Sequence, residues 1–420
     1  MKIIVAHPDK QHSYRLATAL KKANLLDCFI TTVYDKETSI THKIKEFLIG
    51  KNKEKANSRK CSDLDDSDIL LQYEFLNLII IYLSRFPIFL NVCRLLRIKL
   101  SDIFGLRVAK IAIKRKVDAV IMFDSTALSC FKYIKKHNDK IKCILDTSTV
   151  SHSFMKKTFD KEIEISNDFT IKKEFNYLWN PTILQRYDEE ITSADFFLSP
   201  SDIVAKSLIY SGVDKKQIKK IPYGVDISKF NLNKYEDQHS KLRLLFVGQV
   251  NCRKGINHLL NALSKIDEKL IELYIAGNFD HAASWYKKYQ YMQNVHYLGF
   301  VNHDQINILY SKCDLFVLPT LAEGMALVGL EAMASGLPIL CTQFSGINDL
   351  IINQYNGIIY DVFEEFQLFN NIIWCISNRQ SIITMGKNAR RTVENYSWDT
   401  YYKNIEKNIK EIIMRENDQA

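Results

Sequence analysis

The sequence predicts an α/β protein built from two Rossmann-like, doubly wound domains that face a central cleft. Its 420 residues exceed one ordinary hydrophobic core and suit two domains of about 200 residues each. Short apolar runs alternate with longer helical patterns, which is typical of βαβ units and a parallel sheet. This alternation starts afresh at residue 242, so one α/β domain follows another.

The first domain is expected to cover residues 1–225. Helical periodicity at 14–23 and 202–212 supplies crossover connections of the kind that parallel strands require. The charged stretch 50–68 has few apolar residues and predicts a loop. The buried strands are predicted from apolar runs at 2–6, 119–123, 143–146 and 196–200.

The second domain is expected over residues 240–400, after a polar hinge at 221–241. A final helix is predicted at 401–420, because apolar and aromatic residues recur there at helical spacing. That helix either stays with the second domain or crosses back to the first. The strands of the second domain are predicted at 242–248, 270–277, 295–301, 314–320 and 337–342.

The net charge and the cysteines limit which partners and which cellular compartment are expected. The net charge is +9, but acidic residues are interspersed and no zinc-finger or RNP-type motif occurs, so no nucleic-acid partner is expected. A phosphorylated substrate or an acidic membrane surface accounts for the positive sign of the net charge. The nine cysteines are scattered without a C-x-x-C pair, which favours reduced thiols in the cytoplasm. The first apolar run ends at His7, too early for a signal peptide.

The segment 75–100 is rich in apolar residues but is interrupted by charges. Arg85 would lie near the centre of a spanning helix, at a cost of about 3 kcal/mol on insertion scales, so the segment is not expected to cross a membrane. Two interpretations stay open. The segment forms either a basic, apolar surface for peripheral contact with the inner face of the plasma membrane, or buried helices of the first domain.

Two glutamates stand eight positions apart in AEGMALVGLEAMASGLPIL, residues 322–340. The stretch follows a predicted strand and opens a predicted helix, whose first amides would cradle an anion such as phosphate. A carboxylate beside such a cradle suits two hydrogen bonds from a ribose diol, and the other carboxylate suits sugar hydroxyls or partial positive charge at a reacting carbon. By spacing alone, both also fit solvated helix carboxylates. The cradle amides belong to Gly324, Met325, Ala326 and Leu327.

The longer stretch FVLPTLAEGMALVGLEAMASGLPIL, residues 316–340, resembles the signature of the family 4, or group 1, retaining glycosyltransferases, which have GT-B architecture. The resemblance implies that Glu331 holds the ribose of a nucleotide sugar. It also implies that Glu323 lies against the transferred sugar and its leaving phosphate.

A second stretch, LLFVGQVNCRKGINHLL at 244–260, resembles the first strand and loop of the family's second domain. The resemblance implies that Arg253 and Lys254 clamp the donor diphosphate, with Gly248 beside the donor. A guanidinium binds two phosphate oxygens and an ammonium adds a point charge, so together they offset the negative charge that grows as the sugar leaves. A solvent-exposed basic turn is the other interpretation.

The likeness extends over residues 195–400, where the backbone near Gly299 and Val301 is implied to approach the nucleobase. The first 190 residues match only in layout, and no glycine occurs between residues 1 and 40, where the family has a glycine-rich loop. Without glycine the backbone cannot come as close to a phosphate. His12 and Lys10 are therefore the acceptor-side candidates, although Ser13 and its neighbours also suit a helix cap.

His152 follows a predicted strand, at the end where doubly wound sheets place their ligands. The resemblance implies that His152 contacts the donor sugar. A histidine with a purely structural role is the alternative.

Together these inferences predict a glycosyltransferase that uses a nucleotide-sugar donor and needs no cofactor. The resemblance implies that the anomeric configuration is retained and that no metal is required. The acceptor is expected to be a glycan or a lipid-linked glycan, as in bacterial surface polysaccharide or glycolipid synthesis. Two other classes stay open. One is a sugar-nucleotide epimerase or a phosphorylase with the same cleft, and the other is a non-catalytic, glycosyltransferase-like partner subunit.

Overall fold

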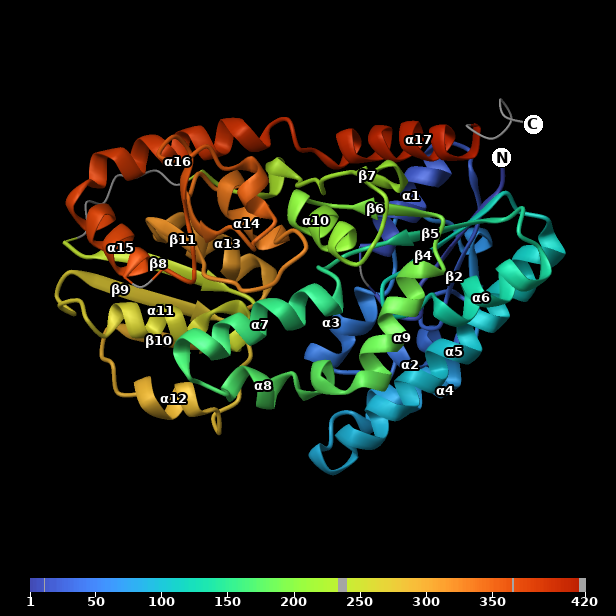
Figure 1. Cartoon of the computed structure of the whole chain (residues 1–420), viewed down its shortest axis with the longest axis horizontal. Helices are drawn as coiled ribbons and strands as arrows, with labels where there is room; N and C mark the ends of the chain where they lie inside the picture. The colour runs from blue at the N-terminus through green and yellow to red at the C-terminus, as the bar shows by residue number, and fades with distance from the viewer. Residues whose placement is uncertain (11, 233–239, 365, 415–420) are drawn as a thin grey trace.

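The computed structural model describes residues 1–10, 12–232, 240–364 and 366–414, which form two parallel sheets flanked by helices (Figure 1). The first sheet has seven strands in the order β3-β2-β1-β4-β5-β6-β7. The strand order reverses between β1 and β4, as in a doubly wound fold. The strands are β1 (Ile3–Ala6), β2 (Leu26–Thr31), β3 (Ile69–Leu71), β4 (Ala119–Phe123), β5 (Lys142–Asp146), β6 (Phe196–Ser199) and β7 (Ile218–Lys220).

Helices cover both faces of this sheet, which explains why β1 and β4 are continuously apolar and buried along their whole length. Local capping sets several helix starts. The side chain of Asn180 accepts hydrogen bonds from the amides of Thr182 and Ile183, and Pro181 is the first residue of α9. The helices are α1 (Ser13–Lys22), α2 (Ile40–Lys45), α3 (Lys51–Asn57), α4 (Glu74–Leu83), α5 (Leu90–Arg115), α6 (Leu128–His137), α7 (His152–Ser166), α8 (Thr170–Glu174), α9 (Pro181–Thr192) and α10 (Asp202–Tyr210).

The second sheet has six strands in the order β10-β9-β8-β11-β12-β13, and its order reverses between β8 and β11. The predicted fold class, two doubly wound α/β units, is confirmed. The strands are β8 (Leu242–Val247), β9 (Ile271–Ala276), β10 (Val295–Gly299), β11 (Leu315–Leu318), β12 (Ile339–Thr342) and β13 (Gly357–Tyr360). The helices are α11 (Ile256–Leu263), α12 (Ser284–Tyr289), α13 (His303–Lys312), α14 (Leu327–Ala334), α15 (Gln367–Ser377) and α16 (Arg379–Val393).

The last helix, α17 (Trp398–Met414), lies against α1 of the first domain (Figure 1). Arg15 Nη1 donates to the Tyr402 hydroxyl at 3.0 Å, and the Arg15 guanidinium stacks 4.7 Å from the ring centre of Trp398. Of the predicted helix 401–420, residues 415–420 lie outside the described residues, as do residues 233–239 of the predicted hinge.

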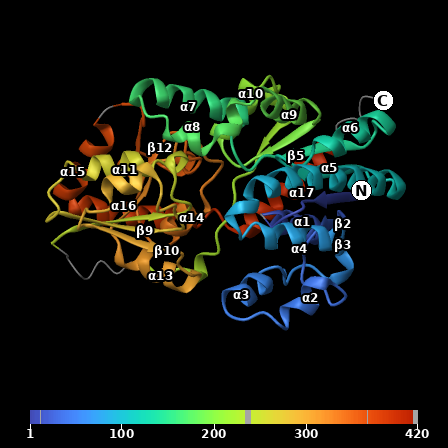
Figure 2. The same ribbon diagram turned by 90° about the horizontal axis from the view of Figure 1, so that it is seen from below.

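Helices α7 and α8 belong to the first domain but lie along the second, as Figures 1 and 2 show. His258 Nε2 on α11 lies 3.0 Å from Glu162 Oε1 on α7. The hydroxyls of Thr170 and Ser284 are 3.0 Å apart. These contacts join the two domains, so that the carboxyl ends of the strands in one sheet face those in the other.

The prediction of a loop at 50–68 is wrong in part, because residues 51–57 form α3. Tertiary contacts fix the residues that follow it. The amide of Asp35 donates to the Arg59 carbonyl at 3.1 Å, and the Tyr34 hydroxyl both accepts from the Cys61 amide and donates to its carbonyl, at 3.0 Å and 3.2 Å. None of these partners is close in sequence, so the local composition could not reveal them.

The segment 75–100 folds into α4, a short turn and the start of α5, and the turn projects from the lower edge of Figure 1. Ile80, Cys93 and Leu100 form a small core between the helices. Many other apolar side chains here are exposed, so the interpretation as buried helices holds only in part. In the part of the chain described, we find no helix with the length and apolarity to span a bilayer.

Candidate functional site

The loop between β11 and α14 stands at the carboxyl edge of the second sheet, beside the point where strand order reverses. The carbonyl of Ala326 accepts from the Gly329 amide at 2.8 Å, so this is the first intrahelical bond of α14. The amides of Leu327 and Val328 precede it and have no partner within the helix. The positive end of α14 is therefore available to an anion.

Glu323 sits in this loop and pairs with both predicted clamp cations. Arg253 Nη1 lies 3.3 Å from Glu323 Oε2 and donates to the Ala322 carbonyl at 2.7 Å. Lys254 Nζ also donates to Glu323 Oε2. The three side chains are only 12–17% exposed, so the alternatives of a solvated carboxylate and a solvent-exposed basic turn do not hold here.

Electrostatics keeps this cluster charged. Burial raises the pKa of Glu323, but the charges of Lys254 and Arg253 outweigh it, and the pKa ends below its usual value. Burial lowers the pKa of Lys254 more than Glu323 raises it. Two cations against one carboxylate leave a net positive charge beside the amino terminus of α14, which suits a polyanionic ligand.

The clamp loop, residues 252–254, is held from both domains. Asn251 Oδ1 accepts from the Lys254 amide at 3.1 Å, and the Arg253 carbonyl accepts from the Leu321 amide at 2.8 Å. Glu174 of α8 reaches across from the first domain and accepts from the Cys252 amide at 2.9 Å. No motif marked Glu174 in the sequence, because its partner is 78 residues away.

The loop that carries Glu323 touches the first domain at Gly324. A Cβ atom on Gly324 would lie 1.8 Å from the Ser148 carbonyl oxygen, so only glycine allows this approach. The Ser201 hydroxyl donates to the Gly324 carbonyl at 2.5 Å, and the amide of Tyr223 lies 3.4 Å from the Met325 sulfur. Gly324 and Met325 therefore lie at the contact between the two domains.

Glu331 and Leu327 lie four residues apart and line one pocket of about 160 Å³. Its other walls include Arg15, Gly224 and Trp398. The Tyr310 hydroxyl on α13 donates to Glu331 Oε2 at 3.1 Å and fixes the carboxylate. Sequence reasoning missed Tyr310, because its apolar neighbours mark it only as part of a helix.

Gly248 and Val301 line a different cavity of about 590 Å³, at the carboxyl ends of β8, β9 and β10. Gly248 has φ +143°, and nothing lies within 4 Å of the place of a Cβ. Ile306 of α13 also lines this cavity, one helical turn before Tyr310. Of the predicted donor residues, Leu327 and Glu331 thus line one cavity and Gly248 and Val301 line another. Arg253 and Lys254 gather at Glu323 instead.

His152 stands at the start of α7, with its ring stacked on Tyr187 at 3.6 Å between centres and 6.1 Å from the Tyr177 ring. Burial lowers the pKa of His152 to about 4, so the ring is neutral at physiological pH. Burial raises the pKa of Tyr177, and the charges of Arg253 and Arg94 oppose that rise. Tyr177 therefore contacts the His152 ring and lies within reach of the charge of Arg253.

The structure does not place the two acceptor-side candidates, His12 and Lys10, in one site. The side chain of His12 is buried, its Nε2 lies 3.0 Å from Asp146 Oδ1, and its ring packs 4.6 Å from Tyr223. Lys10 lies 6.0 Å from the ring centre of Tyr14, and burial lowers its pKa. The capping interpretation of Ser13 is wrong, because His12 is the residue before α1 and no side chain caps that helix.

Other acids near this edge serve the fold of the first domain. Asp124 Oδ1 accepts from the Ser148 hydroxyl at 2.7 Å, and burial raises the pKa of Asp124 to about 6. Glu190 accepts from the amides of Ser125 and Ala127 at 2.7 Å and 2.6 Å, at the amino terminus of α6. Across the described ranges, no three His, Cys, Asp or Glu side chains are grouped to hold a metal ion.

Comparison with known proteins finds a family model that matches the second domain. The family model for glycosyl transferases, group 1, matches residues 228–392. An uncharacterized glycosyltransferase of Methanocaldococcus jannaschii (MJ1607) is 31% identical over 242 residues, which are 53% of this chain and 57% of that protein. The sulfoquinovosyl transferase SQD2 of Arabidopsis thaliana is 27% identical over 49% of this chain and 42% of that protein. The chain thus spans about half the length of these relatives.

Solved structures share the whole fold. Sucrose-phosphate synthase from Thermosynechococcus elongatus superposes with a TM-score of 0.65 at 14% identity, over 99% of this chain and 100% of that one. HepE of Anabaena, in complex with UDP-glucose, gives a TM-score of 0.62 at 15% identity, over 98% and 100%. Such low identity establishes the GT-B fold alone. The second domain of this chain thus matches the family model for glycosyl transferases, group 1, and the chain as a whole shares the GT-B fold.

Proposed function

We propose that the chain is a glycosyltransferase that moves a sugar from a nucleotide-diphosphate sugar to an acceptor hydroxyl, with retention of configuration and without a metal or other cofactor. One observation carries the proposal. Arg253 and Lys254, both nearly buried, meet at Glu323 beside the amino terminus of α14. Buried cations and free helix amides at one point form a site for a diphosphate.

The donor is proposed to lie across the second domain. The diphosphate of the donor binds the two clamp cations in place of Glu323. The Glu323 carboxylate can then accept hydrogen bonds from sugar hydroxyls. Glu331 accepts from the ribose diol, and the cavity lined by Gly248 and Val301 holds the base. The HepE structure with UDP-glucose supports a nucleotide sugar, because the two chains share a fold.

The chemistry follows from this placement. The bond between the anomeric carbon and the diphosphate oxygen breaks, and the acceptor oxygen forms a new bond on the same face. The acceptor proton passes to the departing phosphate. Arg253, Lys254 and the α14 amides stabilise the charge that develops on the diphosphate. Neutral His152 orients the sugar, with Tyr187 holding its ring. Retention rests on the family resemblance.

The biological setting is proposed to be bacterial surface polysaccharide or glycolipid synthesis, in the cytoplasm at the inner face of the plasma membrane. CapM of Staphylococcus aureus, a capsular polysaccharide biosynthesis glycosyltransferase, is 28% identical over 41% of this chain and 48% of that protein. The basic, apolar surface of α4 and α5 suits work beside an anionic bilayer.

A panel of nucleotide sugars tests the proposal. The true donor at about 100 times its dissociation constant should stabilise the fold by about 2.7 kcal/mol, measured as a rise in melting temperature. Incubation with that labelled donor and an acceptor extract should then give a labelled product. An altered free sugar nucleotide would indicate an epimerase, and binding without turnover would indicate a partner subunit.

Replacing Glu331 with alanine should weaken donor binding at least tenfold with a smaller change in turnover. The carboxylate is expected to bind the ribose equally in ground and transition states, and each lost charged hydrogen bond is worth about 1.5–3 kcal/mol. Titration of the donor followed by tryptophan fluorescence measures this. Glu268→Ala, at an exposed position of the same domain, is the control. Unchanged affinity in the Glu331 variant would refute the ribose assignment.

A further inference from the structure

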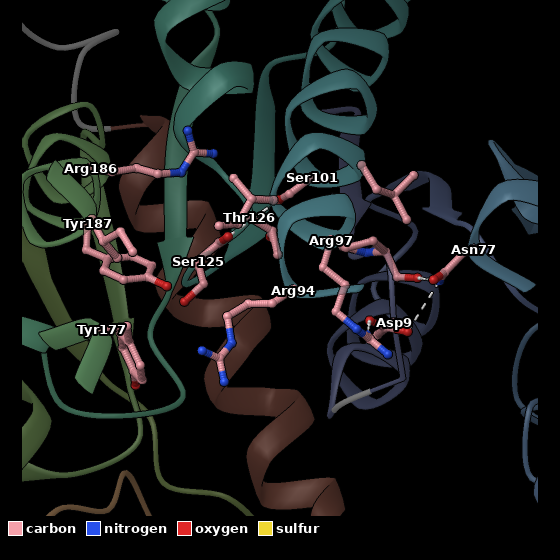
Figure 3. Close-up of a pocket in the computed structure, with 14 residues that line it drawn as sticks. Asp9, Asn77, Arg94, Arg97, Ser101, Ser125, Thr126, Tyr177, Arg186 and Tyr187 are labelled. Carbon is pink, nitrogen blue, oxygen red and sulfur yellow. Dashed lines mark hydrogen bonds and ion pairs between the residues drawn. The ribbon is translucent and has the colours of Figure 1, made fainter. Parts of the chain in front are cut away.

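A pocket of about 300 Å³ opens in the first domain, and the donor site does not use it (Figure 3). It is lined by α5 and α9 and by the residues that follow β1 and β4, including Asp9 and Ser125. Strand order reverses between β1 and β4. The carboxyl ends of strands at such a reversal are where doubly wound sheets bind ligands.

Three arginines line this pocket, and one of them lacks a carboxylate partner. Arg97 Nη1 lies 3.4 Å from Asp9 Oδ2, and Arg186 Nη2 lies 2.6 Å from Asp102 Oδ1. Among the described residues, Arg94 makes no ion pair. Figure 3 shows its guanidinium reaching between Tyr177 and the pair of Arg97 with Asp9. The pocket therefore has the excess positive charge that binds a phosphate group.

A buried amide in the same wall also lacks a partner. Asn77 is 1% exposed, and its Nδ2 donates to the Thr32 hydroxyl at 2.6 Å. Its Oδ1 accepts no hydrogen bond from the described protein atoms. An unpaired buried acceptor is costly, and a ligand hydroxyl near this wall would satisfy it.

The pocket adjoins the proposed site of sugar transfer. Tyr177 and Tyr187 line it, and the same two rings contact His152. The charges of Arg94 and Arg253 both act on the Tyr177 hydroxyl. A ligand in the pocket would thus be one side chain away from the donor clamp.

The helices α4 and α5, which contribute Asn77 and Arg94 to the pocket, also carry exposed apolar side chains. Leu95 lies between Arg94 and Arg97 in sequence and is 63% exposed, Ile88 in the turn before α5 is 82% exposed, and Phe75 on α4 is 66% exposed. Exposed apolar groups on this scale mark a binding surface. Because they lie on or between two helices that line a cationic pocket, they fit a ligand with an anionic head and an apolar chain.

We propose that this pocket binds the acceptor as an anionic amphiphile, a lipid-linked sugar phosphate. Arg94 and Arg97 hold the phosphate, and the apolar chain lies along the exposed face of α4 and α5. The acceptor role rests on the proposed glycosyl transfer, whereas the binding of a phosphate with an apolar chain does not.

Binding of farnesyl phosphate below its critical micelle concentration tests the assignment on the intact protein. Calorimetry should show binding to the unmodified chain, at least tenfold weaker binding of farnesol and of inorganic phosphate, and at least tenfold weaker binding of farnesyl phosphate to Arg94→Gln. Arg85→Gln, on the projecting turn before α5 and outside the pocket, should bind normally. Arg253→Gln in the donor clamp should also bind normally.

Other results would overturn the proposal in distinct ways. An equal loss in Arg85→Gln would indicate diffuse charge attraction, and an equal loss in Arg253→Gln would place the ligand at the donor clamp. If inorganic phosphate bound as tightly as farnesyl phosphate, the apolar chain would contribute nothing and the ligand would not be a lipid. If farnesol bound as tightly as farnesyl phosphate, the phosphate group would contribute nothing to binding. Normal farnesyl phosphate binding in a chain that transfers no sugar would count against the proposed function alone.

The apolar part has its own test. Ile88→Ser with Leu95→Ser should weaken farnesyl phosphate at least tenfold and leave inorganic phosphate unchanged, because only the chain contacts are lost. Ile352→Ser, 62% exposed on the second domain, is the control. Full affinity in the double variant would refute the placement of the lipid chain.

Discussion

Replacing Arg253 and Lys254 together with alanine is expected to lower turnover by about a thousandfold or more. Loss of one preorganised donor at a developing charge typically costs a factor of about 100–1,000. In the proposed function both cations face the diphosphate, whose charge grows as the sugar leaves. Because that charge develops in the transition state, kcat should fall more than KM rises. Initial rates with the donor found in the nucleotide-sugar panel measure the effect.

Two companion variants keep this prediction interpretable. Lys387→Ala with Arg391→Ala removes the same charge from an exposed face of α16 and should leave turnover unchanged. The clamp variant leaves Glu323 buried without a partner, which costs about 3–5 kcal/mol, so adding Glu323→Gln should restore stability but not turnover. Full activity in the stable triple variant would show that the clamp assignment is wrong.

Gly324→Ala should separate the two domains at their contact and lower turnover about a hundredfold or more. Its Cβ would lie 1.8 Å from the Ser148 carbonyl oxygen and 2.6 Å from the Ser148 carbonyl carbon. Backbone atoms cannot move aside as a flexible side chain does, so the loop carrying Glu323 must shift. A displacement of about 1 Å at a reacting site is enough for a hundredfold loss.

Small-angle scattering checks the structural part of this prediction, through a larger radius of gyration in the variant. Gly329→Ala is the control, because its Cβ would meet the Ile347 side chain, within the second domain, at 3.0 Å. An unchanged scattering profile together with normal turnover in Gly324→Ala would show that this contact is not needed.

The sequence by itself determined the fold class and the local arrangements that depend on neighbouring residues. Buried strands such as β4 and amphipathic helices leave periodic patterns that need no tertiary information. Glu323 and the α14 amides could be predicted for the same reason, since strand, loop and helix are contiguous there. Arg253 and Lys254 were found through their own local motif, although their contact with Glu323 spans about 70 residues.

Only the tertiary structure decided which distant groups meet. Glu174 holds the clamp loop from the other domain, and His12 turns inward to Asp146, 134 residues away, instead of facing an acceptor. The pocket of Arg94, Arg97 and Arg186 brings α5 and α9 together with two strand ends. No short-range pattern encodes such contacts, because side-chain periodicity specifies which face of an element is buried but not which element packs against it.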